Sequence, residues 1–468
     1  MLGDRRPTGA GINRMSASLG VAQALWQRRG NDPFEQILAV LGFTIFMGTF
    51  RDVLLTESAN RTAGSALFQL VAGSIYLTGI VVLLARGVPR PMFRVLLHAW
   101  PLVLLTILPL ISTLWSQDPE ATLRRSITLL LSSAFTVFLV VRFDLKTTFK
   151  LVAISFAIFL IIGVIAGAVP GLGITPSGHY AGAWRGLSGQ KNVFGRTVAL
   201  AVALMPMAAA TGLITQRKLA ILFSFLAFGL LILSRSATSL VCAVTSVPLG
   251  VFVYVCLGGR IGRLRLRPEL GIAVLVLAVV IGAAAITYGS AIVLEALGRD
   301  PTLTGRTDIW KWAISTNADR QWLGSGFRAF WIDANTLYYS EFFWMDTPDE
   351  GRSDTWRGPD HAHSGYVDQY LEFGWLGIGV LAATVLSALF RLKQVAARDD
   401  YQLGLAFASV MSFLLVYSTS ERTFLQHSED LWFLFCLFYL YAVKRSLQPI
   451  VTVRNDRVAS PFAALPAR

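Results

Sequence analysis

The chain has 468 residues, of which 54% are hydrophobic and only 15% are charged, and its mean hydropathy is +0.57. A soluble domain is about a quarter charged, so this composition excludes a soluble globular protein and indicates a membrane protein. The formal net charge of +13 could indicate a nucleic-acid partner, but the positions of the basic residues along the chain argue for a different cause.

Apolar runs long enough to cross a bilayer of about 30 Å recur along the whole chain. The polar, basic segment 1–33 that precedes them has no short apolar core followed by a small-residue cleavage site, so we expect no removable signal peptide. We predict an all-α polytopic membrane protein with about twelve transmembrane helices. The predicted spans are 34–50, 66–85, 95–115, 121–141, 149–169, 193–210, 218–234, 237–257, 271–290, 366–390, 401–419 and 429–443.

These spans divide the chain into five parts. We interpret 1–33 as a cytoplasmic N-terminal segment, 34–290 as helices 1 to 9 and 291–365 as one large polar loop. Helices 10 to 12 then occupy 366–445. The tail 446–468 contains three prolines and no apolar periodicity, so we expect it to be cytoplasmic and disordered.

The loop 291–365 is too long for an ordinary connection, and long loops of this kind are usually functional. Its segment 301–315 has helical spacing, and Gly324 and Gly326 mark a turn. We therefore expect short amphipathic helices that lie on the membrane face.

The basic residues give the orientation of the chain. With both termini in the cytoplasm, the two terminal segments and the short cytoplasmic loops, such as 86–94 and 260–267, together hold most of the arginines and lysines, as the positive-inside rule requires. The large loop 291–365 then faces outward, into the periplasm of a bacterium. We interpret the positive charge as an orientation signal and a contact with anionic lipid, and we expect no nucleic-acid partner.

Polar and cationic side chains gather at the outward ends of the predicted spans. A desolvated arginine near hydrocarbon is costly unless it is paired or used, and its planar fork suits phosphate oxygens. These side chains either form a pocket for a lipid-linked diphosphate or pair with the nearby carboxylates of Asp118, Glu120, Asp308, Glu372 and Glu421. Arg235 favours the first alternative because its turn has no acidic neighbour in sequence. The group comprises Arg124, Arg125, Arg185, Lys191, Asn192, Arg196, Arg235, Arg306 and Arg422.

Two of the five histidines lie in "HAHSGYVDQYLEFGWLG" (361–377), just before a predicted span. His361 and His363 are two residues apart in an irregular stretch, so we expect their side chains to diverge. With no third ligand near in sequence, a metal site is not predicted, and we expect no cofactor. A histidine here could serve as a general base or could simply bond to a neighbour at the interface. Glu372 is an intramembrane carboxylate and hence a functional candidate, with one of the arginines as its expected partner.

The three cysteines, Cys242, Cys256 and Cys436, all lie inside apolar runs without metal-ligand spacing. We expect them to be small buried hydrophobic residues.

Twelve spans with both ends inside is also a common layout of secondary transporters. Transporters place their charged residues near the middle of the membrane, whereas here the charges gather at the outer face. The transporter is therefore the less favoured alternative.

Four motifs, in order, carry a resemblance to a known family. They are "WRGLSGQKNVFGRTVAL" (184–200), "LSRSATSL" (233–240), "LTGRTDIW" (303–310) with "WLGSGF" (322–327), and "HAHSGYVDQYLEFGWLGIG" (361–379). Together they resemble the O-antigen ligase and polysaccharide polymerase superfamily, and most of all its ExoQ-type exopolysaccharide polymerases. The motifs cover 184–379, and the predicted twelve-span layout extends the likeness to most of the chain.

The resemblance implies a GT-C-like fold in the bacterial inner membrane and transfer of glycan from undecaprenyl diphosphate at the periplasmic face, without a metal. It implies that His363 is the general base, with His361, Glu372 and Asn192 as supporting residues. The residues that it assigns to the lipid diphosphate, together with one added from the outward cluster, are Arg235, Arg306, Arg185, Lys191 and Arg125.

The implied partners are the lipid-linked glycan, a growing polysaccharide acceptor, membrane lipids, and a flippase and chain-length regulator. A polymerase is favoured, with a ligase that moves glycan to lipid A core or protein as the alternative. Three tryptophans of the large loop, Trp310, Trp331 and Trp344, could stack on sugars or anchor the loop to the bilayer. One departure from the family pattern is Ser364, where asparagine is usual.

Overall fold

The computed structural model describes residues 32–50, 66–177, 180–277, 306–332, 361–426 and 429–448. Within these ranges all the regular structure is helical apart from two isolated β-bridges, so the all-α prediction is confirmed. The α-helices are α2 (Pro33–Phe46), α4 (Ala66–Arg86), α5 (Arg90–His98), α6 (Trp100–Ile111), α7 (Pro119–Arg142), α8 (Leu145–Ala168), α9 (Lys191–Thr211), α10 (Arg217–Ser234), α11 (Ala237–Cys256), α13 (Arg306–Thr316), α15 (Gly365–Ala396), α16 (Tyr401–Tyr417) and α17 (Asp430–Ser446), and the 3-10 helices are η2 (Ser112–Leu114) and η3 (Ala318–Arg320).

Seven of the described helices are long and apolar enough to cross a membrane, and an eighth span results if the bent pair α5 and α6 is counted as one. A polytopic membrane protein is therefore confirmed. The remaining predicted spans correspond to the shorter helices α2, α16 and α17 and to an apolar helix at Pro268–Leu277. The total of twelve stays a prediction, and most of the ninth predicted span lies outside the described residues.

The third predicted span, 95–115, is not one continuous helix. α5 and the helix that follows it are bent by 81° at Ala99. Pro101 is one cause of the bend. A proline has no backbone N–H to donate to the preceding turn of a helix, and its ring clashes with that turn. A second cause is composition, since α5 carries Arg90, Arg94 and His98 and is too polar to extend an apolar span.

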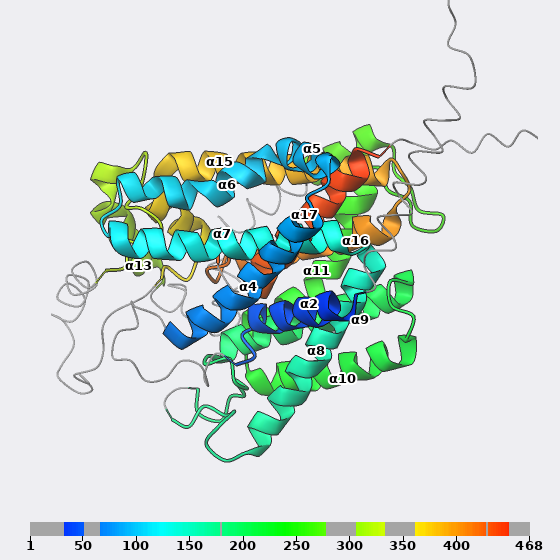
Figure 1. Ribbon diagram of the computed structural model, residues 1–468, viewed down its shortest axis with the longest axis horizontal. Coiled ribbons are helices and arrows are strands. Elements are labelled where there is room, and N and C mark those ends of the chain that lie inside the picture. The colour runs from blue at the N-terminus through cyan, green and yellow to red at the C-terminus, as the bar shows by residue number, and fades with distance from the viewer. Residues whose placement is uncertain are drawn as a thin grey trace, which may run out of the picture.

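Two groups of helices can be distinguished, and an aromatic cluster joins α2, α4, α7 and α17. α6, α7 and α15 lie side by side, and α8, α9 and α10 form a second set (Figure 1). Phe46, Tyr76, Phe135 and Phe433 meet in the core, with the rings of Phe46 and Phe433 stacked 3.7 Å apart between centroids. The three cysteines are buried free thiols, as predicted.

α15 is interrupted near its start by Gly374, whose φ of 60° and ψ of −154° only glycine adopts readily. The segment 321–326 packs into this break. The Trp375 N–H donates to the Gln321 carbonyl at 2.8 Å, and the Ser325 N–H donates to the Leu371 carbonyl at 2.8 Å. The backbone groups freed by the break are thereby satisfied, and the turn predicted at Gly324 and Gly326 has a structural role.

One end of the helix assembly collects the predicted site residues. α13 packs on α15 at this end (Figure 1), and the loop between α16 and α17 lies against the starts of α9 and α15. α13 is a short helix within the predicted large loop, as expected, while 291–305 and 333–360 lie outside the described residues.

Candidate functional site

The segment 361–364 leads directly into α15. Ser364 is the N-cap of the helix, and its hydroxyl accepts the Val367 N–H at 3.5 Å. The Gly365 N–H is bonded to the carbonyls of Ser418 and Glu421, at 2.8 and 3.1 Å. Serine and asparagine are equally good N-caps, so Ser364 keeps the capping function that asparagine would have at this position.

Two tryptophans hold this segment in place. The indole N–H of Trp310 donates to the Ala362 carbonyl at 2.7 Å. That of Trp331 donates to Asp368 Oδ1 at 2.9 Å, and the same oxygen accepts the Ala362 N–H at 3.1 Å. Trp331 is only 8% exposed and packs against Trp312. Neither sugar stacking nor bilayer anchoring therefore applies to Trp331, because it is an internal support. Trp344 lies outside the described residues.

The two histidine side chains converge, contrary to the expectation from their spacing. Their ring centroids are 4.1 Å apart. The cause is the backbone of His363, which has a φ of +49°. This left-handed turn brings both rings to the same side of the chain, which a spacing rule for extended backbone does not predict. Both rings face Glu421.

Glu421, in the loop between α16 and α17, joins the histidines to α9. Its Oε2 lies 3.5 Å from His361 Nε2 and 3.7 Å from His363 Nδ1, the second contact being longer than a hydrogen bond. Its Oε1 accepts the side-chain amide of Asn192 at 2.8 Å. The side chains of His361 and Glu421 are 17% and 12% exposed, whereas that of His363 is 35% exposed. His363 is thus the more accessible histidine.

Glu421 is an anion at neutral pH. Burial alone would raise its pKa, but the two histidines that face the carboxylate more than offset burial and hold the pKa at about 2. An ionised carboxylate only accepts hydrogen bonds, so it favours an N–H on the histidine nitrogen that faces it. In His363 this arrangement leaves Nε2 with the lone pair that a base needs.

Lys191 and Arg235 lie next to this cluster. Arg235 adopts φ +51° in the two-residue turn between α10 and α11, and the ammonium group of Lys191 donates to its carbonyl at 3.1 Å. The Arg235 guanidinium is exposed and donates to the Ala181 carbonyl at 3.1 Å. The next residue, Ser236, donates to Asn192 Oδ1 at 3.2 Å. One hydrogen bond therefore connects the predicted turn to Asn192, and a second connects Asn192 to Glu421.

Arg306 and Arg185 lie at the same end of the helix assembly and come from different segments of the chain. Arg306, the first residue of α13, donates to the Ser420 carbonyl at 3.1 Å, immediately before Glu421. Arg185 belongs to the segment before α9, which is joined to the end of α10 by the Trp184 N–H and the Leu233 carbonyl at 3.0 Å. The structure thus brings Arg306 to the Glu421 loop and Arg185 to the Arg235 turn.

Arg125 belongs to a second cationic group. It donates to the Arg328 carbonyl at 2.6 Å, while Arg328 donates to Gln426 at 3.2 Å. Arg422 forms a buried ion pair with Glu372, so the expected pairing of Glu372 with an arginine is confirmed. Burial, followed by the charges of Arg422 and Arg125, lowers the pKa of Arg328 to about 9. This group holds more positive than negative charge.

Sequence reasoning missed Arg328 as a site residue and treated Glu421 only as an ion-pair partner. Arg328 lies two residues after Gly326 of the predicted turn, which is the one local signal that could have indicated it. Arg196 shows the opposite outcome, because it is buried and bonded to Glu429 and Asp430 at 2.7 and 2.9 Å. For Arg196 the ion-pairing alternative is correct.

The side chains of His361, His363 and Glu421 could together hold a metal ion, because one ligand atom from each lies within 4.8 Å of the others. No third ligand is near in sequence, but the fold brings Glu421 to the two histidines. Glu421 is 58 residues from His363 in sequence and reaches it only through the folding of α15, α16 and their connection.

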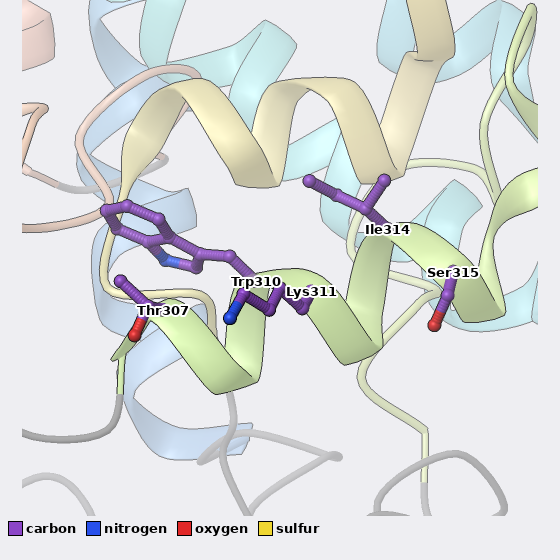
Figure 2. A pocket seen from close by; sticks show the side chains of 5 residues that line it. All are labelled: Thr307, Trp310, Lys311, Ile314 and Ser315. Atoms are coloured by element: carbon purple, nitrogen blue, oxygen red, sulfur yellow. The ribbon is translucent and has the colours of Figure 1, made fainter. Parts of the chain in front are cut away.

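A hollow lies along α13, beside the site. It is lined by Thr307, Trp310, Lys311, Ile314 and Ser315. In Figure 2 the Trp310 indole reaches from α13 toward the chain that leads into α15. Because its N–H is used on Ala362, the ring is fixed in position at the edge of this hollow.

Two comparisons with known proteins agree with this picture. Residues 219–382 match the family model described as O-Antigen ligase. The chain is also 29% identical, over 201 residues, to the exopolysaccharide production protein ExoQ of Rhizobium meliloti (strain 1021), a match that covers 41% of this chain and 42% of that relative. The chain therefore matches less than half of the relative's length. The resemblance inferred from the motifs is thereby confirmed: residues 219–382 are similar to the O-antigen ligase family, and part of the chain is similar to ExoQ.

Proposed function

We propose that this protein is a membrane glycosyltransferase that joins oligosaccharide repeat units carried on undecaprenyl diphosphate into an exopolysaccharide. The supporting observation is the cluster of His361, His363 and Glu421, which lies beside the cationic residues Lys191, Arg235 and Arg306. A base next to a diphosphate-binding group is what glycosyl transfer from a lipid diphosphate requires. The reaction is placed at the periplasmic face of the bacterial inner membrane, with both termini cytoplasmic and a GT-C-like fold.

In the proposed reaction His363 Nε2 takes the proton from an acceptor sugar hydroxyl. The oxygen attacks the anomeric carbon of the donor and inverts its configuration, and the bond from that carbon to the diphosphate oxygen breaks. Glu421 holds the proton on Nδ1 of His363 and stabilises the imidazolium that forms. The higher exposure of His363 favours it over His361 as the base.

The leaving diphosphate gains negative charge in the transition state, and cations placed beside it lower the barrier. Arg306 is proposed for this role because it bonds to the Glu421 loop, and Lys191 and Arg235 because they bond to each other beside Asn192. Arg185 lies next to the Arg235 turn. Arg125 is proposed to act from the second cationic group, with Arg328 and Arg422. The chain-length regulator and the flippase remain proposed partners.

The test is polymer formation from a purified lipid-linked repeat unit by the full-length protein in detergent or nanodiscs. The His363→Gln variant is expected to lose at least about 100-fold in rate, in keeping with the contribution of general base catalysis. His98→Gln is the matched control, since His98 is exposed at the end of α5. A rate near that of the wild type in His363→Gln would rule out the base assignment.

A ligase would give a different product from the same site. In a strain that lacks this protein, loss of a polymerase leaves glycan of single repeat length. Loss of a ligase instead leaves long chains on undecaprenyl diphosphate. Extraction of lipid-linked glycan from such a strain distinguishes the two, and we expect single repeats.

A further inference from the structure

The side chains of His361, His363 and Glu421 lie close enough to share one metal ion, since their ligand atoms are all within 4.8 Å of one another. His361 Nε2 and His363 Nδ1 lie 3.5 and 3.7 Å from the same carboxylate oxygen, Oε2. Two ligand atoms of a tetrahedral zinc ion, each about 2.0–2.1 Å from the metal, lie about 3.3–3.4 Å apart. The observed spacings exceed this value by only a few tenths of an ångström. Two histidines and one carboxylate are also a common zinc ligand set, with a fourth position left for water.

The surroundings hold these three groups in the orientation that a metal site needs. Asn192 donates to Glu421 Oε1 and leaves Oε2 facing the histidines, and Ser236 in turn fixes Asn192. Ala362 lies between the histidines and is fixed at both of its polar backbone groups. Its carbonyl accepts the Trp310 indole N–H, and its N–H donates to Asp368. Such outer contacts orient metal ligands and raise metal affinity.

We propose that His361, His363 and Glu421 bind one Zn²⁺ ion and that the bound ion inhibits the protein. Zinc takes the lone pair of His363 Nδ1. The one ring proton of neutral His363 must then reside on Nε2, and no lone pair is left to accept a proton from a sugar hydroxyl. The inhibitory part rests on the proposed function, whereas zinc binding does not.

The charges near the site indicate reversible rather than permanent binding. Glu421 attracts the ion, but Lys191, Arg235 and Arg306 lie beside the cluster and oppose a second positive charge. The site is thus suited to sense free zinc at the outer face, not to retain it during synthesis and folding.

The binding test uses the full-length protein in detergent, treated with chelator and desalted. Zinc is then titrated in competition with a chromophoric zinc chelator, and bound metal is counted after dialysis. One zinc per chain is expected, with at least about tenfold weaker binding in His361→Gln, His363→Gln and Glu421→Gln. His98→Gln is expected to bind as the wild type does. Absence of stoichiometric binding, or binding that none of the three variants weakens, would overturn the proposal.

The activity test separates the site from the function. Zinc is expected to inhibit polymer formation over the concentration range in which it binds, and chelator is expected to restore the rate. The activity that remains in His361→Gln is expected to be insensitive to zinc. Bound zinc without inhibition, or a chelated protein that needs zinc to work, would overturn the inhibitory role. A protein without activity in either state would contradict the proposed function and leave the binding result standing.

Discussion

Two residues on one face of α9 contact the same loop with different consequences. Asn192 and Arg196 are four residues apart and therefore lie on the same side of the helix, and both reach the loop that connects α16 to α17. Arg196 bonds to Glu429 and Asp430, and both Arg196 and Asp430 are buried. Asn192 bonds to Glu421, whose other oxygen faces two histidines.

The difference lies in how completely the charges are matched. Arg196 is a permanent cation that contacts two carboxylates, and Thr197 also donates to Asp430. Breaking these contacts therefore lowers the stability of the protein. Around Glu421 the partners are a neutral amide and two histidine side chains, a residue type that can act as a general base. One turn of α9 thus separates a contact that holds the loop from a contact that can support chemistry.

The largest expected effect is on folding, at Arg196. Replacement Arg196→Met leaves the buried carboxylate of Asp430 and its neighbour Glu429 without their cation, a loss that typically costs about 3–5 kcal/mol. We expect a clear fall in the midpoint of thermal unfolding and in the yield of monodisperse protein. Arg217→Met, at the exposed start of α10, is the control. An unchanged midpoint in Arg196→Met would remove the distinction between the two contacts.

The next effect is on activity, at Glu421. Glu421→Gln keeps the size of the side chain but removes the negative charge that faces His361 and His363. We expect a loss of about 100-fold in polymer formation with little change in the midpoint of thermal unfolding. Glu120→Gln, at the exposed start of α7, controls for loss of an acidic residue. Unfolding of Glu421→Gln to the degree seen in Arg196→Met would mean that both contacts are structural.

A smaller loss is expected at Asn192. Asn192→Ala removes one hydrogen bond to the Glu421 carboxylate and one from Ser236, each worth about 0.5–1.5 kcal/mol, or more where the group is charged. We expect the rate of polymer formation to fall by about tenfold while the apparent affinity for the lipid-linked substrate changes little. Gln216→Ala, at an exposed position, is the control. A full wild-type rate would show that Asn192 does not orient Glu421.

The smallest effect is expected at Trp331. Trp331→Phe keeps the aromatic packing with Trp312 and Phe330 but removes the hydrogen bond to Asp368. A lost hydrogen bond of this kind costs about 1 kcal/mol, so we expect a rate reduced by roughly fivefold. Trp322→Phe, which changes an exposed indole, is expected to have no effect. Equal rates in the two variants would contradict the role of Trp331 in holding the histidine segment.

Most helices could be predicted because a long apolar run in a membrane protein has few alternatives to a helix. The prediction failed at Ala99, where α5 and α6 form an 81° bend. Pro101 and the polar residues of α5 do not by themselves distinguish a bent pair of helices from one continuous span. The break at Gly374 is similar, since its reason is the packing of the segment 321–326 against α15.

The candidate site was predictable only in part, because its residues come together over long sequence distances. The motifs identified His363, Arg235 and Arg306, and their roles stay predictions. Spacing alone indicated that the two histidines diverge, and it could not reveal the left-handed backbone at His363. The position of Glu421 beside the histidines depends on the fold of three segments, and no local pattern of sequence predicts it.

The most direct test of the account is a single-turnover measurement with a lipid-linked repeat unit and excess protein. It compares the wild type, His363→Gln and His98→Gln after substrate binding has been measured for each. The account predicts that His363→Gln binds the lipid-linked substrate as the wild type does but transfers glycan at least about 100-fold more slowly, while His98→Gln is unchanged. Transfer by His363→Gln at the wild-type rate would contradict the assignment of His363 as the base.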